Sequence, residues 1–387
     1  MSTSTDVRFG IIGMGNMGSS HAKNILAGKV PGLKLAGICD SNPEKLKGYA
    51  EDLPTFASAD ALFDAGILDA VLIATPHYDH TTLGIKALEK GLHVLVEKPI
   101  SVHKADCEKL IAAHTNEKQV FAAMFNQRTN PQYQKLRAMI QGGELGDLKR
   151  VQWTITDWFR SEFYYQSGGW RATWAGEGGG VLLNQCPHQL DLWQWLFGMP
   201  SKVRAFLTLG KFHDIEVEDD VTAYLEYDNG CTGVFITTTG EAPGTNRLEV
   251  AGDRGKVVIE NGTFSFIRNE VPTSEHSRTV QAGFTRPEVW NVEIPVAGGG
   301  EQHVGIMKNF AKAVLNGEAL IARAEEGIHS VELANAMILS GCTHETIELP
   351  MNPETYRGFL QDKIDNSNHV KKTVDVKASA DDFSSSF

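Results

Sequence analysis

The chain has no long apolar run, since no stretch approaches the roughly eighteen consecutive apolar residues that a membrane-spanning helix needs. Basic residues are outnumbered, with 36 Lys and Arg against 48 Asp and Glu and a formal net charge of -12. That balance disfavours nucleic acid and anionic membranes as partners. The first ten residues also lack a signal-peptide pattern and a twin arginine. These absences predict a cytoplasmic protein with a small-molecule partner.

Cysteine is scarce as well. The five cysteines are odd in number, widely spaced and free of any C-x-x-C pair, so they indicate neither a disulfide framework nor a zinc site. His77 and His80 are three residues apart, but the sequence places no third or fourth ligand beside them. We therefore expect reduced thiols and no metal.

The most informative pattern present is a glycine-spaced loop within residues 9–22, where an apolar run changes into a helical pattern. Gly13, Gly15 and Gly18 have the spacing G-x-G-x-x-G. In that motif the first glycine makes a tight turn, the second lets the backbone approach a pyrophosphate, and the third allows close helix packing. The helix starting near Asn16 and Met17 would point its free N–H groups at the phosphates. The loop predicts a dinucleotide site.

An acidic residue indicates which dinucleotide. The next expected strand, 35–40, ends in Asp40, where this motif places the group that accepts the adenosine ribose hydroxyls. Ser41 and Asn42 bring no arginine to hold a 2'-phosphate. The predicted cofactor is NAD.

Expected strands at 69–75, 93–96 and 120–125 alternate with expected helices, which predicts a doubly wound parallel sheet with ligands at the carboxyl ends of its strands. Thr75, Lys98 and Asn126 follow such ends and should line one crevice.

From about residue 130 the pattern changes to a helix, a strand near 148–156, an aromatic-rich stretch, a helix toward residue 197 and five short alternating segments. These segments predict a mostly antiparallel sheet, followed by helices near 304–316 and 325–343. We expect three parts: an NAD-binding Rossmann domain at 1–126, an α+β domain for substrate binding and oligomerisation at 127–365, and a polar tail or arm at 366–387.

Taken together, these motifs resemble the Gfo/Idh/MocA family of NAD(P)-dependent sugar and polyol oxidoreductases, from residue 7 to about 349. The features that carry the likeness are the glycine loop with Asp40, the Thr75-Pro76 turn with His80, Glu97-Lys98-Pro99, and Gly178-Gly179-Gly180 before a helix with His188 and Asp191. The resemblance implies hydride exchange between a secondary alcohol and nicotinamide, with Lys98 and His188 beside the reacting carbon.

The resemblance also implies that the 75–80 turn contacts the nicotinamide side of the cofactor, with His77 where the family often has Asn. Subunits of the family commonly pair through the antiparallel sheet, so we expect a homo-oligomer, a dimer or tetramer. The expected cofactor contacts are Gly13, Gly15, Asn16, Met17, Gly18, Asp40, Thr75, Pro76, His77, His80, Glu97, Lys98 and Asn126.

Lys98 and His188 are the candidate catalytic residues. A partly desolvated lysine beside a cationic nicotinamide has reason for a lowered pKa and can take the alcohol proton. On a continuous helix, Asn184, His188 and Asp191 would share one face, with Asp191 orienting the histidine ring. The family usually has an aspartate at Asn184. Pro187 is a second departure, because it removes an N–H and requires the helix to start late, kink or bulge.

Six of the seven tryptophans fall between residues 153 and 195. We expect Trp153, Trp193 and Trp195 in the core. Sugars stack their C–H faces on indole rings while their hydroxyls bond polar groups. The expected substrate contacts are Trp158, Trp170 and Trp174 as a carbohydrate wall, with Lys98, Arg128, Arg160, Tyr164, Arg171, Asn184 and His188 as polar partners.

Two other functions stay open beside an NAD-dependent sugar or glycoside dehydrogenase. One is a redox-neutral glycosidase that oxidises, eliminates and re-reduces on a retained NAD. The other is a non-catalytic NAD-binding sugar sensor, against which the presence of Lys98 and His188 argues.

Overall fold

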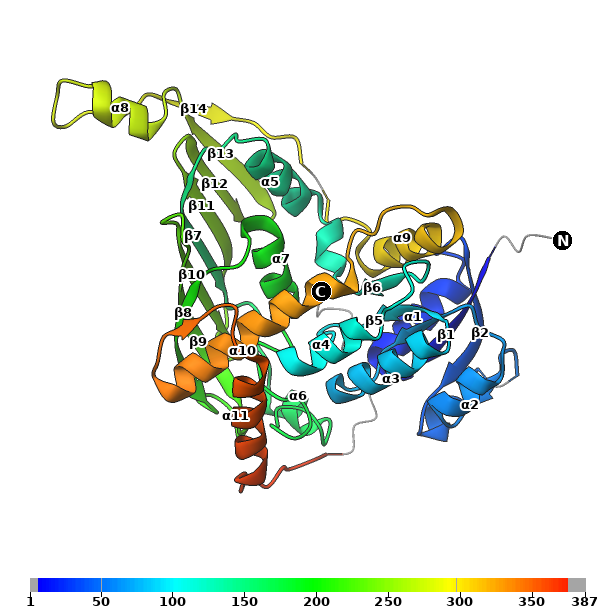
Figure 1. Cartoon of the computed structure of the whole chain (residues 1–387). Helices are drawn as coiled ribbons and strands as arrows, with labels where there is room; N and C mark the ends of the chain where they lie inside the picture. Colours follow the sequence, from blue (N-terminus) through cyan, green and yellow to red (C-terminus); the bar gives the residue numbers. More distant parts are fainter. Residues whose placement is uncertain (1–5, 50, 297, 375–387) are drawn as a thin grey trace.

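The computed structural model describes residues 6–49, 51–296 and 298–374, and two sheets dominate it (Figure 1). The first sheet is parallel, with the strand order β3-β2-β1-β4-β5-β6 of a doubly wound dinucleotide fold. Its strands are β1 Val7–Ile12, β2 Leu33–Cys39, β3 Thr55–Phe56, β4 Ala70–Ile73, β5 His93–Val96 and β6 Phe121–Ala123.

Helices cover both faces of this sheet, so its strands are apolar along their length. All four residues of β4 are buried, for example. The covering helices are α1 Asn16–Leu26, α2 Ala59–Asp64, α3 His77–Glu89 and α4 Lys104–Ala112. The predicted polar helix near residue 43 is only one 3-10 turn, η1 Pro43–Lys45.

The second sheet has nine strands in the order β14-β13-β12-β11-β7-β10-β9-β8-β15. All neighbours pair antiparallel except β7 and β10, so the prediction of a mostly antiparallel sheet is confirmed. The strands are β7 Leu148–Ile155, β8 Lys202–Leu209, β9 Glu218–Glu226, β10 Thr232–Thr238, β11 Asn246–Gly252, β12 Gly255–Glu260, β13 Thr263–Asn269, β14 Val289–Val292 and β15 Ile347–Glu348.

One face of this large sheet is covered and the other is open. In β9 the side chains of Val221, Ala223 and Leu225 are buried, whereas the alternate residue Tyr224 is 42% exposed. Figure 1 shows α5 Pro131–Gln141, α7 Pro187–Phe197 and α10 Gly327–Thr343 on the face toward the parallel sheet. These helices therefore lie between the two sheets.

The helix α9 Gln302–Asn316 belongs to the core of the first unit, although it lies far along the chain. Phe310 packs edge-on against Phe9 of β1, with ring centroids 5.9 Å apart. The Ala123 amide of β6 also donates to the Ala322 oxygen at 3.1 Å. A linear boundary at residue 126 thus does not account for the whole core of the nucleotide-binding unit.

The remaining elements are η2 Asn126–Thr129, α6 Glu162–Gln166, α8 Thr273–Thr279, η3 Ala324–Glu326 and α11 Pro353–Asp365. Of the predicted tail, residues 366–374 are described and lie along the aromatic stretch, where the Val374 amide donates to the Gln166 oxygen at 3.0 Å. Residues 375–387 lie outside the described part of the chain. No helix in the described ranges is long and apolar enough to span a membrane.

Candidate active site

A cavity of about 670 Å³ follows the carboxyl ends of the parallel strands and reaches the aromatic stretch of the second unit. The predicted cofactor contacts that line it are Gly13, Gly15, Asn16, Met17, Asp40, Thr75, Pro76, His77, His80, Glu97 and Lys98. Besides Lys98, which is also a predicted substrate contact, three others line it: Trp170, Arg171 and Asn184.

The glycine loop leaves room for a phosphate. Gly13 has a φ of 92°, and a Cβ atom there would lie 2.5 Å from the Ala74 oxygen. A Cβ on Gly18 would lie 1.8 Å from the Gly13 oxygen, so loop and helix approach closely. Gly15 has open space above it, directly before α1 begins. The open backbone and the helix N-terminus fit a pyrophosphate.

Asp40 is held rigidly at the end of β2. One carboxylate oxygen accepts the Met14 amide and the other accepts the Asn42 amide, both at 2.8 Å. The Lys45 ammonium lies 3.3 Å from the same carboxylate. Because the carboxylate retains free lone pairs beside the cavity, it suits the vicinal hydroxyls of a ribose.

His80 ties two strand ends together. Its ring nitrogens lie 2.8 Å from the Thr75 oxygen, after β4, and 2.8 Å from the Pro99 oxygen, after β5. Burial lowers its pKa more than the two carbonyls raise it. The buried hydroxyl of Thr75 has no hydrogen-bond partner among the described residues. Thr75 is a residue of the cavity lining, and its unpaired hydroxyl is consistent with a bound ligand.

Glu97 and Lys98 follow β5 at the far end of the cavity. Glu97 accepts from the buried ring of His21, with 2.7 Å between Nε2 and Oε1. Burial raises the pKa of Glu97, but this bond and the charges of His21, His303 and Lys98 outweigh it and bring the pKa to about 2. A fixed anion therefore lies beside Lys98 at neutral pH.

The Lys98 ammonium donates to the Asn184 backbone oxygen at 2.8 Å. Its pKa is lowered, chiefly because burial disfavours the charged form, and the charges of Arg160 and Arg171 lower it further. A lysine with a depressed pKa at this position can exchange a proton with an alcohol.

His188 is buried at the start of α7, and neither ring nitrogen has a hydrogen-bond partner in the described chain. Burial, and next the charge of Lys98, lower its pKa well below the ordinary value. The ring is therefore neutral at pH 7. It offers one donor and one acceptor that a substrate can satisfy.

The turn before α7 differs from the predicted helical face. The helix begins at Pro187, so of the three expected outcomes the structure shows the late start, and Asn184 lies before the helix and not on it. Asp191 does not orient His188. Its carboxylate is paired with the guanidinium of Arg128, through nitrogen–oxygen distances of 2.8 and 2.6 Å.

Arg128 is therefore a structural residue and the prediction of a substrate contact was wrong. Only 1% of it is exposed, and it also pairs with Glu326. Trp174 likewise belongs to the core, where it is 3% exposed and packs edge-on against Phe359. Neither side chain lines the cavity.

Other predicted residues also lie outside the cavity lining. Asn126 is fully buried and donates to Gln302 at 2.8 Å. The remaining ones are Gly18, Trp158, Arg160, Tyr164 and His188. Trp158 is partly buried, and its indole N–H lacks a partner among the described residues.

The aromatic stretch forms a stacked wall that is joined to Lys98 through Asn184, which bonds both the Tyr164 hydroxyl and the Lys98 ammonium. The Arg171 guanidinium lies 4.7 Å from the ring centroids of both Tyr164 and Trp170. The Arg160 guanidinium lies 5.2 Å from the Tyr164 ring centroid. Trp170 contacts His77 edge-on at 5.6 Å. Planar cations between aromatic rings give this wall a fixed shape.

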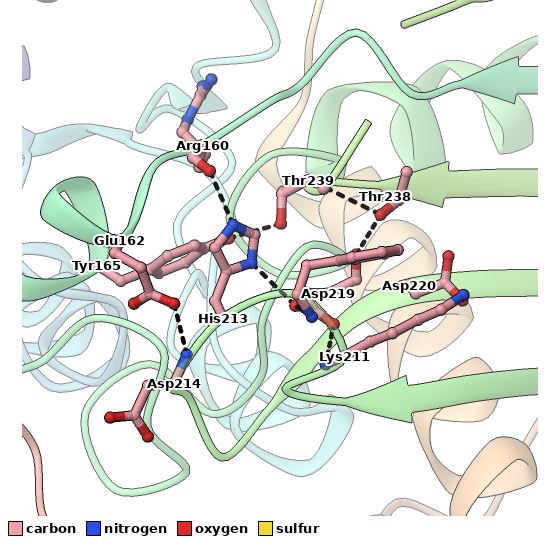
Figure 2. A network of polar contacts seen from close by, with 12 residues as sticks. Arg160, Glu162, Tyr165, Lys211, His213, Asp214, Asp219, Asp220, Thr238 and Thr239 are labelled. Carbon is pink, nitrogen blue, oxygen red and sulfur yellow. Dashed lines mark hydrogen bonds and ion pairs between the residues drawn. The ribbon is translucent and has the colours of Figure 1, made fainter. Parts of the chain in front are cut away.

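Several contacts hold the backbone and neighbours of this wall, and Figure 2 shows those around Arg160, Tyr165 and His213. His213 bridges the Asp219 carboxylate and the Arg160 backbone oxygen. The Tyr165 hydroxyl lies 2.8 Å from that of Thr239. The Lys371 ammonium donates to the Arg171 oxygen at 2.7 Å.

Sequence reasoning missed Glu177, His21 and His303. Glu177 is buried, accepts the Ala172 amide and the Asn184 side chain, and has a raised pKa because of burial. His303, near Lys98 and Glu97, has its pKa lowered to about 4, mainly by burial. An acid directly before three glycines was the one available signal for Glu177. No group of three or more His, Cys, Asp or Glu residues in the described ranges could hold a metal ion.

The parallel sheet, the open glycine loop, the acid at the end of β2 and a lysine at the same crevice define an NAD-dependent oxidoreductase. Residues 7–125 match the model of an oxidoreductase family with an NAD-binding Rossmann fold, and residues 133–258 match a GFO/IDH/MocA C-terminal domain. The chain belongs to the Gfo/Idh/MocA family, and its cofactor is NAD.

Named relatives are similar over most of the chain. An inositol 2-dehydrogenase of Rhizobium meliloti is 25% identical, covering 86% of this chain and 96% of the relative. A levoglucosan dehydrogenase of Pseudarthrobacter phenanthrenivorans is 23% identical, covering 89% and 98%. The crystal structure of the WlbA dehydrogenase of Bordetella pertussis with NADH and UDP-GlcNAcA aligns with a TM-score of 0.75 at 25% identity, covering 90% of this chain and 100% of that one.

Proposed function

We propose that the protein transfers a hydride between NAD and a ring secondary hydroxyl or ketone of a sugar or glycoside. The observation that carries this proposal is the placement of Lys98, whose ammonium bonds the backbone of Asn184, the residue that joins it to the stacked aromatic wall. One group suited to proton transfer thus lies between the predicted cofactor crevice and a wall suited to sugar faces. The similarity to an inositol 2-dehydrogenase and a levoglucosan dehydrogenase supports it.

The residues that would hold NAD are those of the glycine loop, Asp40 and the 75–80 turn. When bound, the nicotinamide ring accepts or returns the hydride of the carbinol carbon. Lys98 in its neutral form takes the hydroxyl proton as the alcohol becomes a ketone, and in its ammonium form returns it in the reverse direction. Glu97, with its pKa of about 2, stays anionic and stabilises the ammonium.

His188 would bind the same hydroxyl as a neutral ring, because its two nitrogens are buried and unpaired within the described residues. Asn184 cannot act as a base. Its side chain bonds Glu177 and Tyr164, so it would position the substrate through the wall. Trp170 and Arg171 line the cavity and supply an apolar face and a donor fork for sugar C–H and O–H groups.

A panel of sugars and glycosides followed by NADH absorbance tests this function, together with mass spectrometry of protein-bound nucleotide. We expect NADH formation with at least one ring alcohol and release of NADH in each turnover. Glycoside cleavage without net NADH, on a nucleotide that survives gel filtration, would instead identify the redox-neutral glycosidase. Sugar binding with no turnover of any kind would identify a sensor.

We propose the domain limits 1–126 and 127–365 for the main units, with α9 returning to the first.

We also propose that the chain forms a homo-oligomer through the open face of the nine-stranded sheet, where Phe206 is 61% and Tyr224 42% exposed. A cytoplasmic location is supported by five cysteines that are all free.

A further inference from the structure

His213 lies outside the cavity, on the turn between β8 and β9, and both of its ring nitrogens face acceptors. Nδ1 lies 2.9 Å from a carboxylate oxygen of Asp219, and Nε2 lies 2.8 Å from the backbone oxygen of Arg160. Figure 2 shows the ring between these two partners. The Asp219 oxygens also accept the amides of Lys211 and Phe212, so both oxygens act as acceptors. Because neither partner donates, only a doubly protonated ring satisfies both contacts.

We propose that His213 is a positioning residue for the sugar site, and that as an imidazolium it fastens residues 158–165, here called the wall loop, to the end of the nine-stranded sheet. This inference rests on the proposed function, because the wall loop acts on the sugar site through Tyr164, whose ring stacks on Arg171 of the cavity lining. Sugar affinity then depends on the protonation of a residue that does not touch the sugar.

The wall loop links His213 to the reacting centre. The Arg160 guanidinium lies 5.7 Å from the Trp158 ring centroid, and the Tyr164 hydroxyl donates to the Asn184 side chain at 3.3 Å. The backbone oxygen of Asn184 accepts from Lys98. A shift of the Arg160 backbone therefore moves the aromatic wall relative to Lys98.

Deprotonation acts selectively on one of the two contacts. A neutral imidazole keeps a single N–H, and a carboxylate is a stronger acceptor than a carbonyl. The proton therefore stays on Nδ1 toward Asp219. The lone pair of Nε2 then faces the Arg160 oxygen at 2.8 Å, and the two atoms repel.

Two other anchors of the wall loop do not depend on this proton. The Arg160 amide donates to the Thr239 oxygen at 2.9 Å, and the Tyr165 hydroxyl bonds that of Thr239. Deprotonation should consequently loosen the loop without unfolding it.

The surroundings of His213 favour the charged ring. From α6, Glu162 accepts the Asp214 amide, and the Tyr165 ring lies 4.7 Å from the His213 ring. Nearby cations are already paired, Lys211 with Asp220 and Lys372 with Asp214. Burial lowers the pKa of His213, but Asp219, the Arg160 carbonyl and Glu162 outweigh it and raise that pKa. By contrast, both acceptors at His80 are uncharged carbonyls, and its pKa is lowered, chiefly by burial.

The direction of the pH effect follows from the raised pKa. The contact with Arg160 is fully present below the ordinary histidine pKa of 6.5. It is lost as the pH rises through the higher pKa that His213 has in the folded protein. Wild-type KM for sugar should therefore rise roughly tenfold across this step, the effect expected for one hydrogen bond to a charged group.

His213→Phe removes both ring bonds at similar volume. We expect its KM for sugar to be high at every pH with no step, while kcat and the Kd for NAD stay within about threefold of wild type. His114→Phe is the matched control. The His114 ring also lies between a carboxylate, Glu325, and a backbone oxygen, that of Gln119, both at 3.0 Å, but away from the cavity. This variant should keep the wild-type step.

Two measurements on the wild-type protein test the proposal. They apply even if no sugar is turned over or if His213→Phe does not fold. NMR of the His213 ring should show an imidazolium at about pH 6, and hydrogen exchange in residues 158–165 should speed up as that ring loses its proton. The proposal would be overturned if the His213 ring were already neutral at about pH 6, or if hydrogen exchange in residues 158–165 did not change as the ring loses its proton. It would also be overturned if His213→Phe kept the wild-type rise of KM with pH. Failure of every sugar to react would defeat the proposed function alone.

Discussion

The side-chain nitrogen of Lys98 and the backbone oxygen of Asn184 lie 2.8 Å apart and join the end of a parallel strand to the turn before α7. This contact fixes where the lysine amine can meet a substrate. The contact uses the backbone of residue 184 and not its side chain, so it does not depend on whether an Asn or an Asp stands there.

Replacing Lys98 with Met should lower kcat for sugar oxidation by about a hundredfold to ten-thousandfold, the usual contribution of a general acid-base group. NAD affinity should stay within a few-fold. His188→Asn should lose less in kcat and more in KM, because the neutral ring binds the hydroxyl. Lys90→Met, which breaks only an exposed ion pair with Asp64, is the control. The opposite ranking would move proton transfer to His188.

The rate of sugar oxidation should rise with pH, because the neutral amine of Lys98 is the base and burial lowers its pKa below 10.5. Reduction of the matching ketone requires the ammonium and should fall over the same range. Measuring kcat in both directions from about pH 6 to about pH 10 checks this. This dependence of kcat on pH should be absent in Lys98→Met. Parallel profiles in the two directions would contradict the assignment.

Asp40 should make NAD bind more tightly than NADP, because its carboxylate repels a 2'-phosphate and accepts ribose hydroxyls. Asp40→Ser combined with Ser41→Arg should narrow or invert the preference for NAD over NADP. Lys45, whose ammonium lies 3.3 Å from the Asp40 carboxylate, loses that partner in the double variant and becomes free to pair with the 2'-phosphate. Fluorescence titration with both cofactors measures this. Equal wild-type affinities for the two would refute it.

Trp170 and Trp174 should respond differently to replacement by Ala. Trp170 lines the cavity, so Trp170→Ala should raise KM for sugar with little change in stability. Trp174 is 3% exposed, so Trp174→Ala should lower the free energy of unfolding by about 3–5 kcal/mol. Urea denaturation and sugar kinetics on both variants separate the two effects. Equal losses of stability would place Trp170 in the core as well.

The architecture was predictable because its signals are local. The β5 strand His93–Val96 has the bounds expected from its short apolar run, and Asp40 directly follows β2. A late start, a kink or a bulge in α7 followed from Pro187, whose missing N–H constrains only its own turn, and the structure shows the late start. Glycine spacing and strand alternation are properties of neighbouring residues, so one sequence suffices to read them.

The pairing of charged side chains was not predictable in the same way. Asp191 is three residues after His188, but its partner is Arg128, 63 residues away. His21 and Glu97 are separated by 76 residues. Burial of Trp174 likewise depends on Phe359, which belongs to α11. Such contacts arise from tertiary packing, and no spacing within one helix or turn reports them.

The docking of α9 against β1 has a consequence for synthesis. Phe9 leaves the ribosome well before its partner Phe310, which follows only after all the strands from β1 to β14 have been made. Until then, the surface of β1 that Phe310 covers remains apolar and uncovered. The nucleotide-binding unit therefore completes its core only after α9 has been translated. A fragment released early, ending near residue 126, would expose an apolar face that is prone to aggregation.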